Sequence, residues 1–553
     1  MTQLDPSQPG TNKTRWRLPA RAGYACLAAF WLAQTLVNVW WLKVDTRPPF
    51  YDTAGHAMLT FQLARAPFVT APLAAGKTLL GMGPYPPFVY LASVPFALLF
   101  GPSVDALIRV HAIFLAILLA ATYELGRRLD RPATGLTAAL LVGMYPILYG
   151  LSRHYLLDLP LVAMVALAVC CLVRAEAFQH LGASLLFGVA VGLGMLTKWT
   201  FVVFIVAPFV ISCVAMVKEY SPARLRNMLL SVLAGGVIAS PWYLANLNML
   251  AGFFQTNGFL AAALEGDPPI VSLRSWLYYA DALINHQLFL PFVVLFVLGL
   301  VLVLWKHKLD RSTGIVLAWV LVPYLLFSAF VNKDIRYVLP YLPAIALLTA
   351  LGWAQVRNRR VARAIWAATA VYALFQYAGL SFGLSHRLGA RALPAHVALP
   401  LGDLRLTLYR ESVHLATPPR TENWRVQEIL GDILEDSAAA EPPEGPIRLV
   451  VVTNRPYFET QGFRYYAHLD DLPVRVDSIT GVRSHDGAEI VRESDYAVLK
   501  SGDLGPVWSL QDAAALAEAI RDPNSELGRQ FVRIGEYALP DGSTAQLYRH
   551  ERG

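Results

Sequence analysis

Asp52 and His56 are the first residues in the chain whose types and spacing are suited to chemistry. They lie in the segment Pro48-Pro-Phe-Tyr-Asp-Thr-Ala-Gly-His-Ala57, and a helix starting after the prolines would carry both on one face as an i,i+4 pair. Asp52 could then act as a general base, with His56 as its partner or as a metal ligand. The same spacing also allows a purely structural role, in which Asp52 caps the helix. One Asp–His pair supplies too few ligands to predict a metal site.

Four further charged residues lie in very short links between apolar runs: Arg153, Asp158, Lys198 and Arg336. Ionisable groups at or inside a membrane boundary are costly, so they mark functional sites by default. The alternative is that the cationic side chains only extend their charged ends to the water interface. The shortness of the links favours the functional interpretation for these four residues.

The elements that must position these residues are long apolar helices. A helix needs about 20 mostly apolar residues to span a bilayer. The sequence has eleven runs near that length: 22–42, 104–126, 133–151, 157–174, 181–197, 200–217, 227–247, 286–305, 312–331, 337–355 and 361–381. A twelfth run, 86–100, is short and begins with two prolines, so it could either span the membrane or lie at its surface.

The distribution of Lys and Arg decides between these topologies, because cytoplasmic loops carry an excess of basic residues. With eleven spans and the N-terminus inside, cytoplasmic segments hold 18 of the 28 basic residues in residues 1–382. A twelfth span would move the later basic loops outside. We therefore predict a cytoplasmic segment 1–21, a membrane domain 22–382 that begins with a retained signal anchor, and an external C-terminus. Two external loops, 43–103 and 248–285, are long enough to build a site.

The composition supports a membrane protein. The chain has 553 residues, of which 56% are hydrophobic and 15% are charged, whereas soluble proteins carry about 25% charged residues. The net charge of +7 is the sum of +14 in residues 1–382 (28 basic minus 14 acidic) and −7 in residues 383–553 (18 minus 25). Most of the basic excess therefore sets orientation and is no evidence for nucleic-acid binding. The four cysteines all lie in apolar runs, which excludes a disulfide framework for the tail.

Residues 383–553 are predicted to form a small soluble α/β domain outside the membrane. Strand-like segments occur at 448–453 and 496–499, and 457–469 has a helical pattern. The segment 531–548 reads as a terminal hairpin with Asp541-Gly542 in its turn.

Several motifs follow one another in an order that resembles a known family. In chain order they are Tyr51-Asp52, Pro86 to Gly101, Arg109 with Arg127-Arg128, Ser152-Arg153 with Asp158, Gly194 to Lys198, and Arg336 to Pro343. Together, over residues 20–380, they resemble the polytopic glycosyltransferases of the GT-C fold. The resemblance is to the bacterial branch related to protein O-mannosyltransferases and lipid A aminoarabinose transferases. No single motif is specific; their order and topology carry the resemblance.

The resemblance implies an all-α membrane domain and an enzyme of the bacterial inner membrane. Such enzymes move a sugar from a polyprenyl phosphate lipid to a hydroxyl of a glycan, lipid or protein on the extracytoplasmic face, generally with inversion. Asp52 would then be the general base, and Asp158 would orient a cation or the sugar. The departing lipid phosphate needs cations and a binding surface. The candidates for these are Arg153, Lys198, Arg336, Lys77, Arg274 and Tyr85.

Two positions depart from the family's pattern. Many relatives carry Asp-Glu in the first motif, where this chain has Asp52-Thr53, and the aminoarabinose branch has an acidic–basic pair where this chain has Pro84-Tyr85. The sequence therefore predicts no required cofactor. His56 and His154 are the residues through which a metal could still bind, and neither the sugar nor the acceptor is indicated.

Two other classes of protein share some of these features. A lipid or sugar transporter, or a flippase, would also have many spans and charges inside the membrane. Transporters usually show two corresponding halves, and no such duplication is found here. A non-catalytic assembly or receptor protein would use the tail as its binding module.

Overall fold

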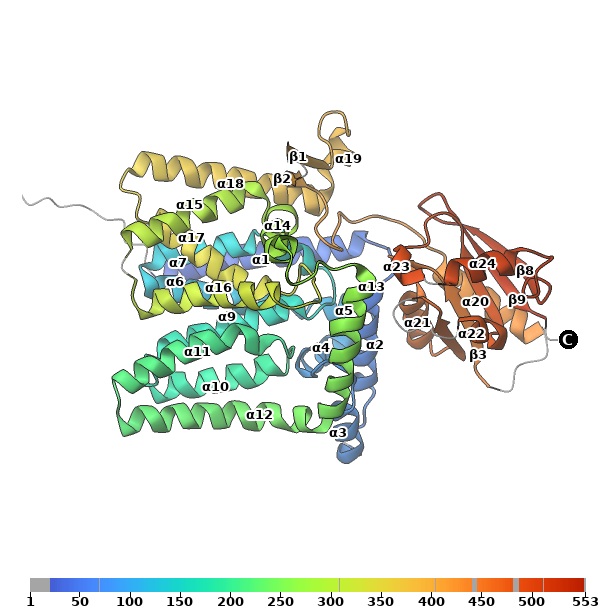
Figure 1. Cartoon of the computed structure of the whole chain (residues 1–553), viewed down its shortest axis with the longest axis horizontal. Coiled ribbons are helices and arrows are strands. Elements are labelled where there is room, and N and C mark those ends of the chain that lie inside the picture. The colour runs from blue at the N-terminus through green and yellow to red at the C-terminus, as the bar shows by residue number, and fades with distance from the viewer. Residues whose placement is uncertain are drawn as a thin grey trace, which may run out of the picture.

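The computed structural model describes residues 20–551 except 69, 308, 403, 440–444, 481–486 and 511. The predicted cytoplasmic segment 1–21 thus lies almost wholly outside the described residues. Figure 1 shows a bundle of helices that run along the long axis, with a separate C-terminal domain beyond one end of the bundle. This end is called the domain-facing end below.

Most predicted apolar runs are helices that lie within one long bundle. These helices are α1 (Ala20–Val44), α5 (Val104–Ile108), α6 (His111–Leu129), α7 (Pro132–Gly143), α8 (Pro146–Leu151), α9 (Asp158–Ala175), α10 (Leu181–Met195), α11 (Phe201–Lys218), α12 (Pro222–Gln255), α15 (Leu290–Lys306), α16 (Arg311–Ser328), η3 (Leu339–Tyr341), α17 (Leu342–Trp353) and α18 (Arg359–Phe382). Seven helices in the described part are long and apolar enough to cross a membrane, and five more are apolar but shorter. The count of eleven spans remains a prediction.

Helices α9 and α17 form the centre of the bundle. Nearly every residue of both is buried, and both are apolar all round, as expected for helices that other helices surround. Helices α15 and α17 approach each other closely at glycines, because a Cβ at Gly352 of α17 would lie only 1.9 Å from the backbone of Gly299 in α15.

The predicted external loops form a layer across the domain-facing end. They contain α2 (Tyr51–Ala64), α3 (Pro72–Leu80), α4 (Phe88–Phe100), η1 (Thr256–Leu260), α13 (Ala261–Glu265), α14 (Leu273–Ala282) and η2 (Leu283–Gln287). Figure 1 shows α2 running across the bundle axis at this end. The run 86–100 is the 13-residue helix α4, which has Pro95 in its interior.

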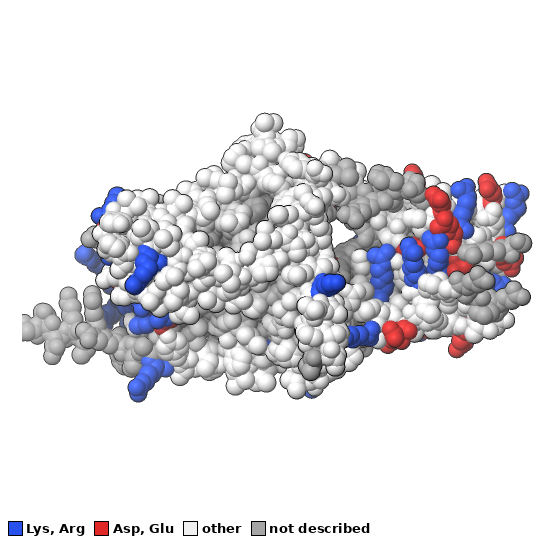
Figure 2. Space-filling view, turned by 90° about the horizontal axis from the view of Figure 1, so that it is seen from below, with Lys and Arg blue, Asp and Glu red and all other residues white. Residues whose placement is uncertain are grey.

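The charged residues at the surface also divide the molecule into the far end of the bundle, the middle of the bundle and the C-terminal domain. Figure 2 shows Lys and Arg at the end of the bundle farthest from the C-terminal domain, a wide band of uncharged surface, and mixed charges on that domain. The same view shows the surface hollowed where the bundle meets the C-terminal domain. Basic residues at the far end are what the positive-inside rule expects of the cytoplasmic side.

The C-terminal part begins with a segment that packs on the bundle. It contains α19 (Leu384–Leu388) and the antiparallel hairpin of β1 (His396–Leu401) and β2 (Leu404–Arg410). The hydroxyl of Tyr372 in α18 donates to the backbone oxygen of Leu408, 2.9 Å away. The division at residue 383 stays a prediction, although these contacts tie residues 396–410 to the membrane helices.

The remaining tail is an α/β domain, as predicted, and the structure adds that both faces of its sheet are covered. Its five-stranded sheet has the order β6-β3-β7-β9-β8, in which β3 is parallel to β6 and β7 while β9 is antiparallel to β7 and β8. Leu449 and Val451 of β3 face one core, and Val450 and Val452 face the other. The elements are α20 (Val426–Ala439), β3 (Ile447–Val452), β4 (Asn454–Arg455), β5 (Phe458–Glu459), α21 (Thr460–Leu469), β6 (Val474–Ser478), α22 (Gly487–Glu493), β7 (Tyr496–Lys500), α23 (Val507–Leu510), α24 (Ala513–Arg521), β8 (Phe531–Ala538) and β9 (Thr544–His550).

Candidate active site

Arg336 lies at the centre of a cluster of charges at the domain-facing end. It belongs to the link between α16 and η3, and Asp334 of the same link holds its guanidinium: Nη2 is 2.8 Å and Nε is 3.0 Å from Oδ2 of Asp334. Burial by itself would raise the pKa of Asp334, but the Arg336 guanidinium outweighs it and holds that pKa well below its usual range. The Asp334–Arg336 fork is therefore fully ionised.

Two more carboxylates, at the starts of two other helices, lie close to the same guanidinium. Nη1 of Arg336 is 3.3 Å from Oδ2 of Asp52 and 3.6 Å from Oδ2 of Asp158. The other oxygen of Asp158 is 3.1 Å from Nζ of Lys198. The result is an alternating chain of charges, Lys198–Asp158–Arg336–Asp52. Arg336 lies between two carboxylates, and Lys198 lies beside one.

Accessibility differs sharply along this chain of charges. The side chain of Asp158 is 3% exposed and that of Arg336 is 16% exposed, whereas that of Asp52 is 47% exposed. Asp52 is thus the member whose oxygens are open to a reactant. Burial raises the pKa of Asp52, but the attraction of Arg336, and then of His56 and Lys198, outweighs this effect, so the pKa ends below its ordinary value.

The local sequence explains why these residues meet. Pro48 and Pro49 end the extended segment after α1, so α2 begins at Tyr51 and carries Asp52 in its first turn. Asp158 is the first residue of α9, where the partial positive charge of a helix N-terminus favours a carboxylate. Lys198 lies between α10 and α11, and this link is tied to α4 because Phe88 N–H donates to the oxygen of Leu196 at 3.0 Å.

His56 lies one turn beyond Asp52 and bonds to a tyrosine. Its Nδ1 is 2.8 Å from the hydroxyl of Tyr90, and its ring lies edge-on to that of Tyr85 at 5.2 Å. Burial lowers the pKa of His56 to about 4. The imidazole is therefore neutral at physiological pH, and the predicted i,i+4 placement with Asp52 is confirmed. Tyr85 is half-buried beside it.

Arg153 does not join this cluster. Its Nε donates to Asn38 at 2.9 Å and its Nη2 to Ser381 at 2.7 Å, and its guanidinium lies over the rings of Trp41, Tyr149 and Tyr377. The side chain is 2% exposed and has no ion pair with a carboxylate in the described part of the chain. Its contacts join α1, α8 and α18, so they give it a place in the bundle rather than beside Asp52.

The other predicted residues lie outside the cluster as well. Lys77 on α3 and Arg274 on α14 are exposed and form no ion pair among the described residues, so both remain available to an anion. His154 is buried against Trp41 and Phe50, and burial lowers its pKa to about 3.

No metal-binding group is found in the described ranges: nowhere do three His, Cys, Asp or Glu side chains meet in a way that could hold an ion. The three aspartates instead surround the guanidinium of Arg336, which neutralises part of their charge.

Sequence reasoning did not assign roles to Asp334 and Tyr90. Asp334 lies only two residues before Arg336, and this spacing in a short link is the signal by which the sequence indicates it. Tyr90 lies in an apolar helix with no polar neighbour in sequence, and its bond to His56 follows only from the packing of α2 on α4.

Comparisons with known proteins agree with this architecture. The family model "Dolichyl-phosphate-mannose-protein mannosyltransferase" matches residues 85–245. Two related proteins of Pseudomonas fluorescens strains, both undecaprenyl phosphate-alpha-4-amino-4-deoxy-L-arabinose arabinosyl transferases, are 27% and 25% identical. The first alignment covers 45% of this chain and 46% of the relative, and the second covers 66% and 62%. The chain thus spans about half of the length of the curated relatives it matches.

Solved structures extend the likeness to almost the whole chain. The crystal structure of ArnT from Cupriavidus metallidurans bound to undecaprenyl phosphate has a TM-score of 0.56 at 15% identity and covers 95% of this chain and 98% of its own. The arabinofuranosyltransferase AftD from mycobacteria has a TM-score of 0.52 at 13% identity and covers 97% and 40%. The chain is a multi-pass membrane protein with the GT-C fold, and it is related in sequence to the aminoarabinose transferases.

Proposed function

We propose that the chain is a membrane glycosyltransferase that moves a sugar from a polyprenyl phosphate donor to an acceptor hydroxyl on the extracytoplasmic face of a bacterial inner membrane. One observation carries the proposal: Asp52, open to reactants, shares Arg336 with the buried Asp158, which in turn holds Lys198. A base and two cations thus lie within reach of one another at one end of the bundle.

In the proposed reaction Asp52 is the general base. Its carboxylate takes the proton of the acceptor hydroxyl, while the hydroxyl oxygen forms a bond to the anomeric carbon of the sugar. The bond between that carbon and the phosphate oxygen breaks, and its electron pair remains on the lipid phosphate. Attack from the face opposite the leaving phosphate inverts the anomeric centre.

Arg336 and Lys198 are the cations proposed to stabilise the departing phosphate. Both are fixed by carboxylates before substrate arrives, and such preorganised charge needs no rearrangement as the reaction proceeds. Asp158 lies between them and orients both. Lys77 and Arg274, which have no ion pair among the described residues, are proposed to guide the anionic lipid to the site, and Tyr85 beside His56 is proposed to contact the sugar.

The likeness to the aminoarabinose transferases supports a sugar donor on undecaprenyl phosphate. The proposed topology has the N-terminus in the cytoplasm, residues 22–382 in the membrane with eleven spans, and residues 383–553 outside. The domain-facing end of the bundle, with Asp52, is then extracytoplasmic.

The test uses purified full-length protein in vesicles with a panel of undecaprenyl phosphate sugars, including the 4-amino-4-deoxy-arabinose donor. Release of undecaprenyl phosphate with transfer of the sugar to an acceptor supports the proposal, and mass spectrometry of envelope lipids and glycans from cells with and without the protein names the acceptor. Movement of the intact lipid-linked sugar between leaflets, without release of undecaprenyl phosphate from any donor, would instead identify a flippase.

A further inference from the structure

Glu459 connects the C-terminal domain to the helix that carries Asp52. It ends β5 and lies at the start of α21, and it is only 3% exposed. Its Oε2 accepts the N–H of Gln461 at 2.6 Å, and its Oε1 accepts that of Gly462 at 2.9 Å, which is an ordinary cap of α21. Oε1 also accepts the N–H of Tyr51 at 3.1 Å, and Tyr51 is the first residue of α2.

One carboxylate therefore caps two helices that belong to different parts of the chain. The first backbone N–H groups of a helix have no partner within the helix. For α2, Glu459 supplies an acceptor at this position, and its negative charge is favourable at the helix N-terminus. Phe50, the residue before α2, makes no side-chain cap of its own.

The contact between the start of α21 and the start of α2 is close, and further contacts lie on both sides of it. A Cβ on Gly462 would lie 3.3 Å from the backbone oxygen of Pro49, so only glycine brings α21 this near without displacement. The hydroxyl of Tyr51 donates to the backbone oxygen of Asn454 at 2.8 Å, and the rings of Phe50 and Tyr457 are 4.6 Å apart.

The backbone of Tyr51 also requires support. Its φ is +48°, a left-handed conformation that bulky residues rarely adopt and that persists where the surroundings enforce it. The supporting contacts come from the C-terminal domain. Asp52 is the next residue, so the conformation of Tyr51 sets the direction in which α2 presents Asp52.

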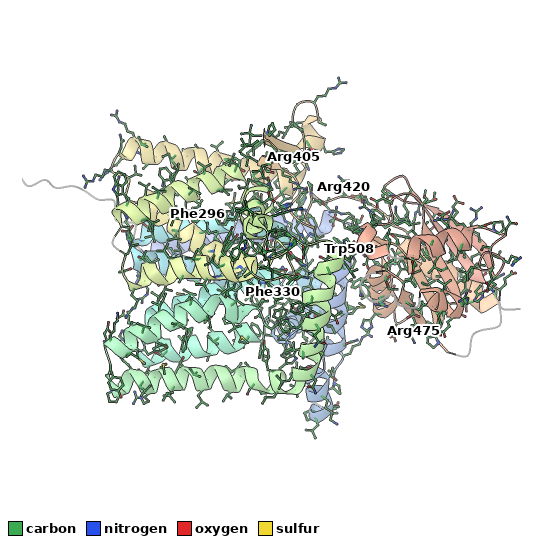
Figure 3. All side chains as sticks on the ribbon, in the orientation of Figure 1. Phe296, Phe330, Arg405, Arg420, Arg475 and Trp508 are labelled. Carbon is green, nitrogen blue, oxygen red and sulfur yellow. The ribbon has the colours of Figure 1, made fainter. Side chains whose placement is uncertain are left out.

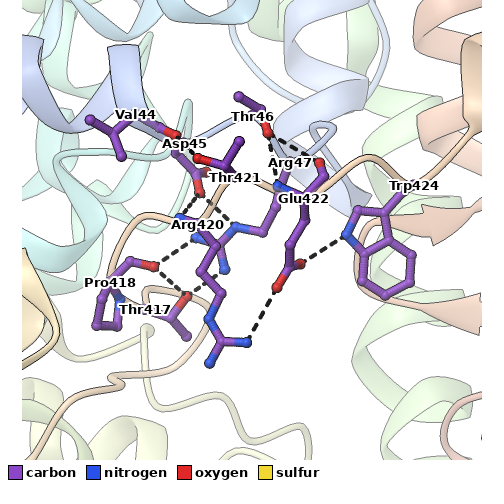
Figure 4. A network of polar contacts seen from close by, with 10 residues as sticks. All are labelled: Val44, Asp45, Thr46, Arg47, Thr417, Pro418, Arg420, Thr421, Glu422 and Trp424. Carbon is purple, nitrogen blue, oxygen red and sulfur yellow. Dashed lines mark hydrogen bonds and ion pairs between the residues drawn. The ribbon is translucent and has the colours of Figure 1, made fainter. Parts of the chain in front are cut away.

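The segment before α2 is fixed to the link between β2 and α20, which leads into the C-terminal domain (Figure 4). Oδ1 of Asp45 accepts the N–H of Arg420 at 2.9 Å and the Nε–H of Arg47 at 2.7 Å. The N–H of Thr46 donates to the oxygen of Arg420 at 3.0 Å. Figure 3 shows Arg420 between the bundle and the C-terminal domain, with Trp508 at the near edge of that domain.

We propose that Glu459 is a positioning residue for the transfer reaction, through which the C-terminal domain holds α2 so that Asp52 meets Arg336. The inference rests on the proposed function of Asp52 as the base. It gives the tail a defined role: Glu459 acts on the reaction through the N-terminus of α2.

The test compares full-length Glu459→Ala and Glu459→Gln with a control that loses a helix cap elsewhere. Asp310 is suitable because it caps α16 by accepting the N–H of Thr313 at 2.8 Å, and it belongs to the opposite end of that helix from Arg336. A displacement of the base by about 1 Å can cost about 10²-fold in rate. For Glu459→Ala we expect a fall in kcat of that order, with the KM for the lipid donor nearly unchanged.

Three readouts distinguish positioning from a general loss of folded protein. In Glu459→Ala, hydrogen exchange should increase in peptides covering residues 51–64, and the acidic limb of the pH–rate profile should move to higher pH as Asp52 leaves Arg336. Glu459→Gln should recover part of the rate, because its amide oxygen can accept from both Tyr51 and Gly462 while the N–H of Gln461 loses its acceptor. Asp310→Ala should show none of these changes.

Unchanged exchange in residues 51–64 of Glu459→Ala would overturn the inference, as would a rate loss accompanied by an unmoved acidic limb. The exchange measurement does not need activity. If the unaltered protein transferred no sugar while Glu459→Ala still loosened residues 51–64, the proposed function would fail but the control of α2 by Glu459 would stand.

Discussion

Arg336 and Asp52 are 284 residues apart in the chain, yet Nη1 of Arg336 lies 3.3 Å from Oδ2 of Asp52. The pair joins the link after α16 to the first turn of α2. Arg336 is also held by Asp334, in its own link, and by Asp158, at the start of α9. The position of Asp52 relative to this cation therefore depends on three segments: the start of α2, the start of α9 and the link after α16.

Replacing Asp52 with Asn should remove the base while keeping the shape of the site. We expect sugar transfer to fall by about 10²- to 10⁴-fold, the range that a positioned base contributes. The donor should still bind, because Lys198 and Arg336 remain. Vesicle assays with Asp281→Asn as the control give the comparison, since Asp281 is an exposed acid on α14. Full transfer by Asp52→Asn would show that another group is the base.

Replacing Arg336 with Gln should change the pH dependence of transfer. In the unaltered protein the pKa of Asp52 is below its ordinary value, chiefly because Arg336 outweighs the effect of burial, so activity should persist to below pH of about 4. Without the guanidinium the pKa of Asp52 rises, and the carboxylate is protonated at a higher pH. The acidic limb of kcat/KM should therefore move upward; an unmoved limb would contradict the assignment.

His56 should make the protein less stable in mild acid. Its pKa in the folded protein is lowered to about 4 by burial, while the unfolded value is about 6.5. The unfolded chain therefore binds a proton first as the pH falls, and stability is lost between these two values. This shift in pKa corresponds to a loss of at most about 3 kcal/mol in the free energy of unfolding. Thermal unfolding in detergent should show a smaller loss between pH 6.5 and 4 for His56→Gln, and an equal loss would argue against a buried neutral imidazole.

Breaking the Lys198–Asp158 pair should affect stability as well as transfer. Asp158 is almost fully buried, and removing one member of such a pair leaves an uncompensated charge. Since Arg336 still faces Asp158, we expect Lys198→Met to cost roughly 2–4 kcal/mol. The double variant Lys198→Met/Asp158→Leu should regain much of the stability but not the transfer activity. A double variant as unstable as Lys198→Met would refute this account.

Topology can be checked with single cysteines and a label that does not cross membranes. Asp471, whose side chain is 91% exposed in the C-terminal domain, should react from outside as Asp471→Cys. Arg357, in the link before α18, should react as Arg357→Cys only after the membrane is opened. Reversed accessibility would mean that the bundle has the opposite orientation.

Much of the fold is readable from the sequence because it depends on local patterns. Apolar runs predict the helices of the bundle, and the continuous apolar run 449–452 predicts a buried strand, whose two faces both contact cores. The cluster was only partly readable. Asp158, Lys198 and Arg336 stand out as charges in short links, and Asp52 stands out by its spacing from His56, but nothing in the sequence states that they touch.

Residues defined by tertiary packing escaped prediction. Arg153 lies in a link just like that of Lys198, yet its side chain turns into a cage of aromatic rings between helices. Glu459 falls inside the predicted helix 457–469, and its contact with the start of α2 depends on how α21 meets α2. Spacing along one segment cannot reveal which way a side chain turns between two others.

The carboxylates that surround Arg336 bear on turnover. In the proposed reaction the lipid phosphate approaches a guanidinium that already has the carboxylates of Asp52, Asp158 and Asp334 as partners. These carboxylates stay beside the guanidinium while the phosphate is bound. If the proposed reaction takes place, the spent carrier lipid has resident competitors for its cation, and we expect these competitors to weaken product inhibition.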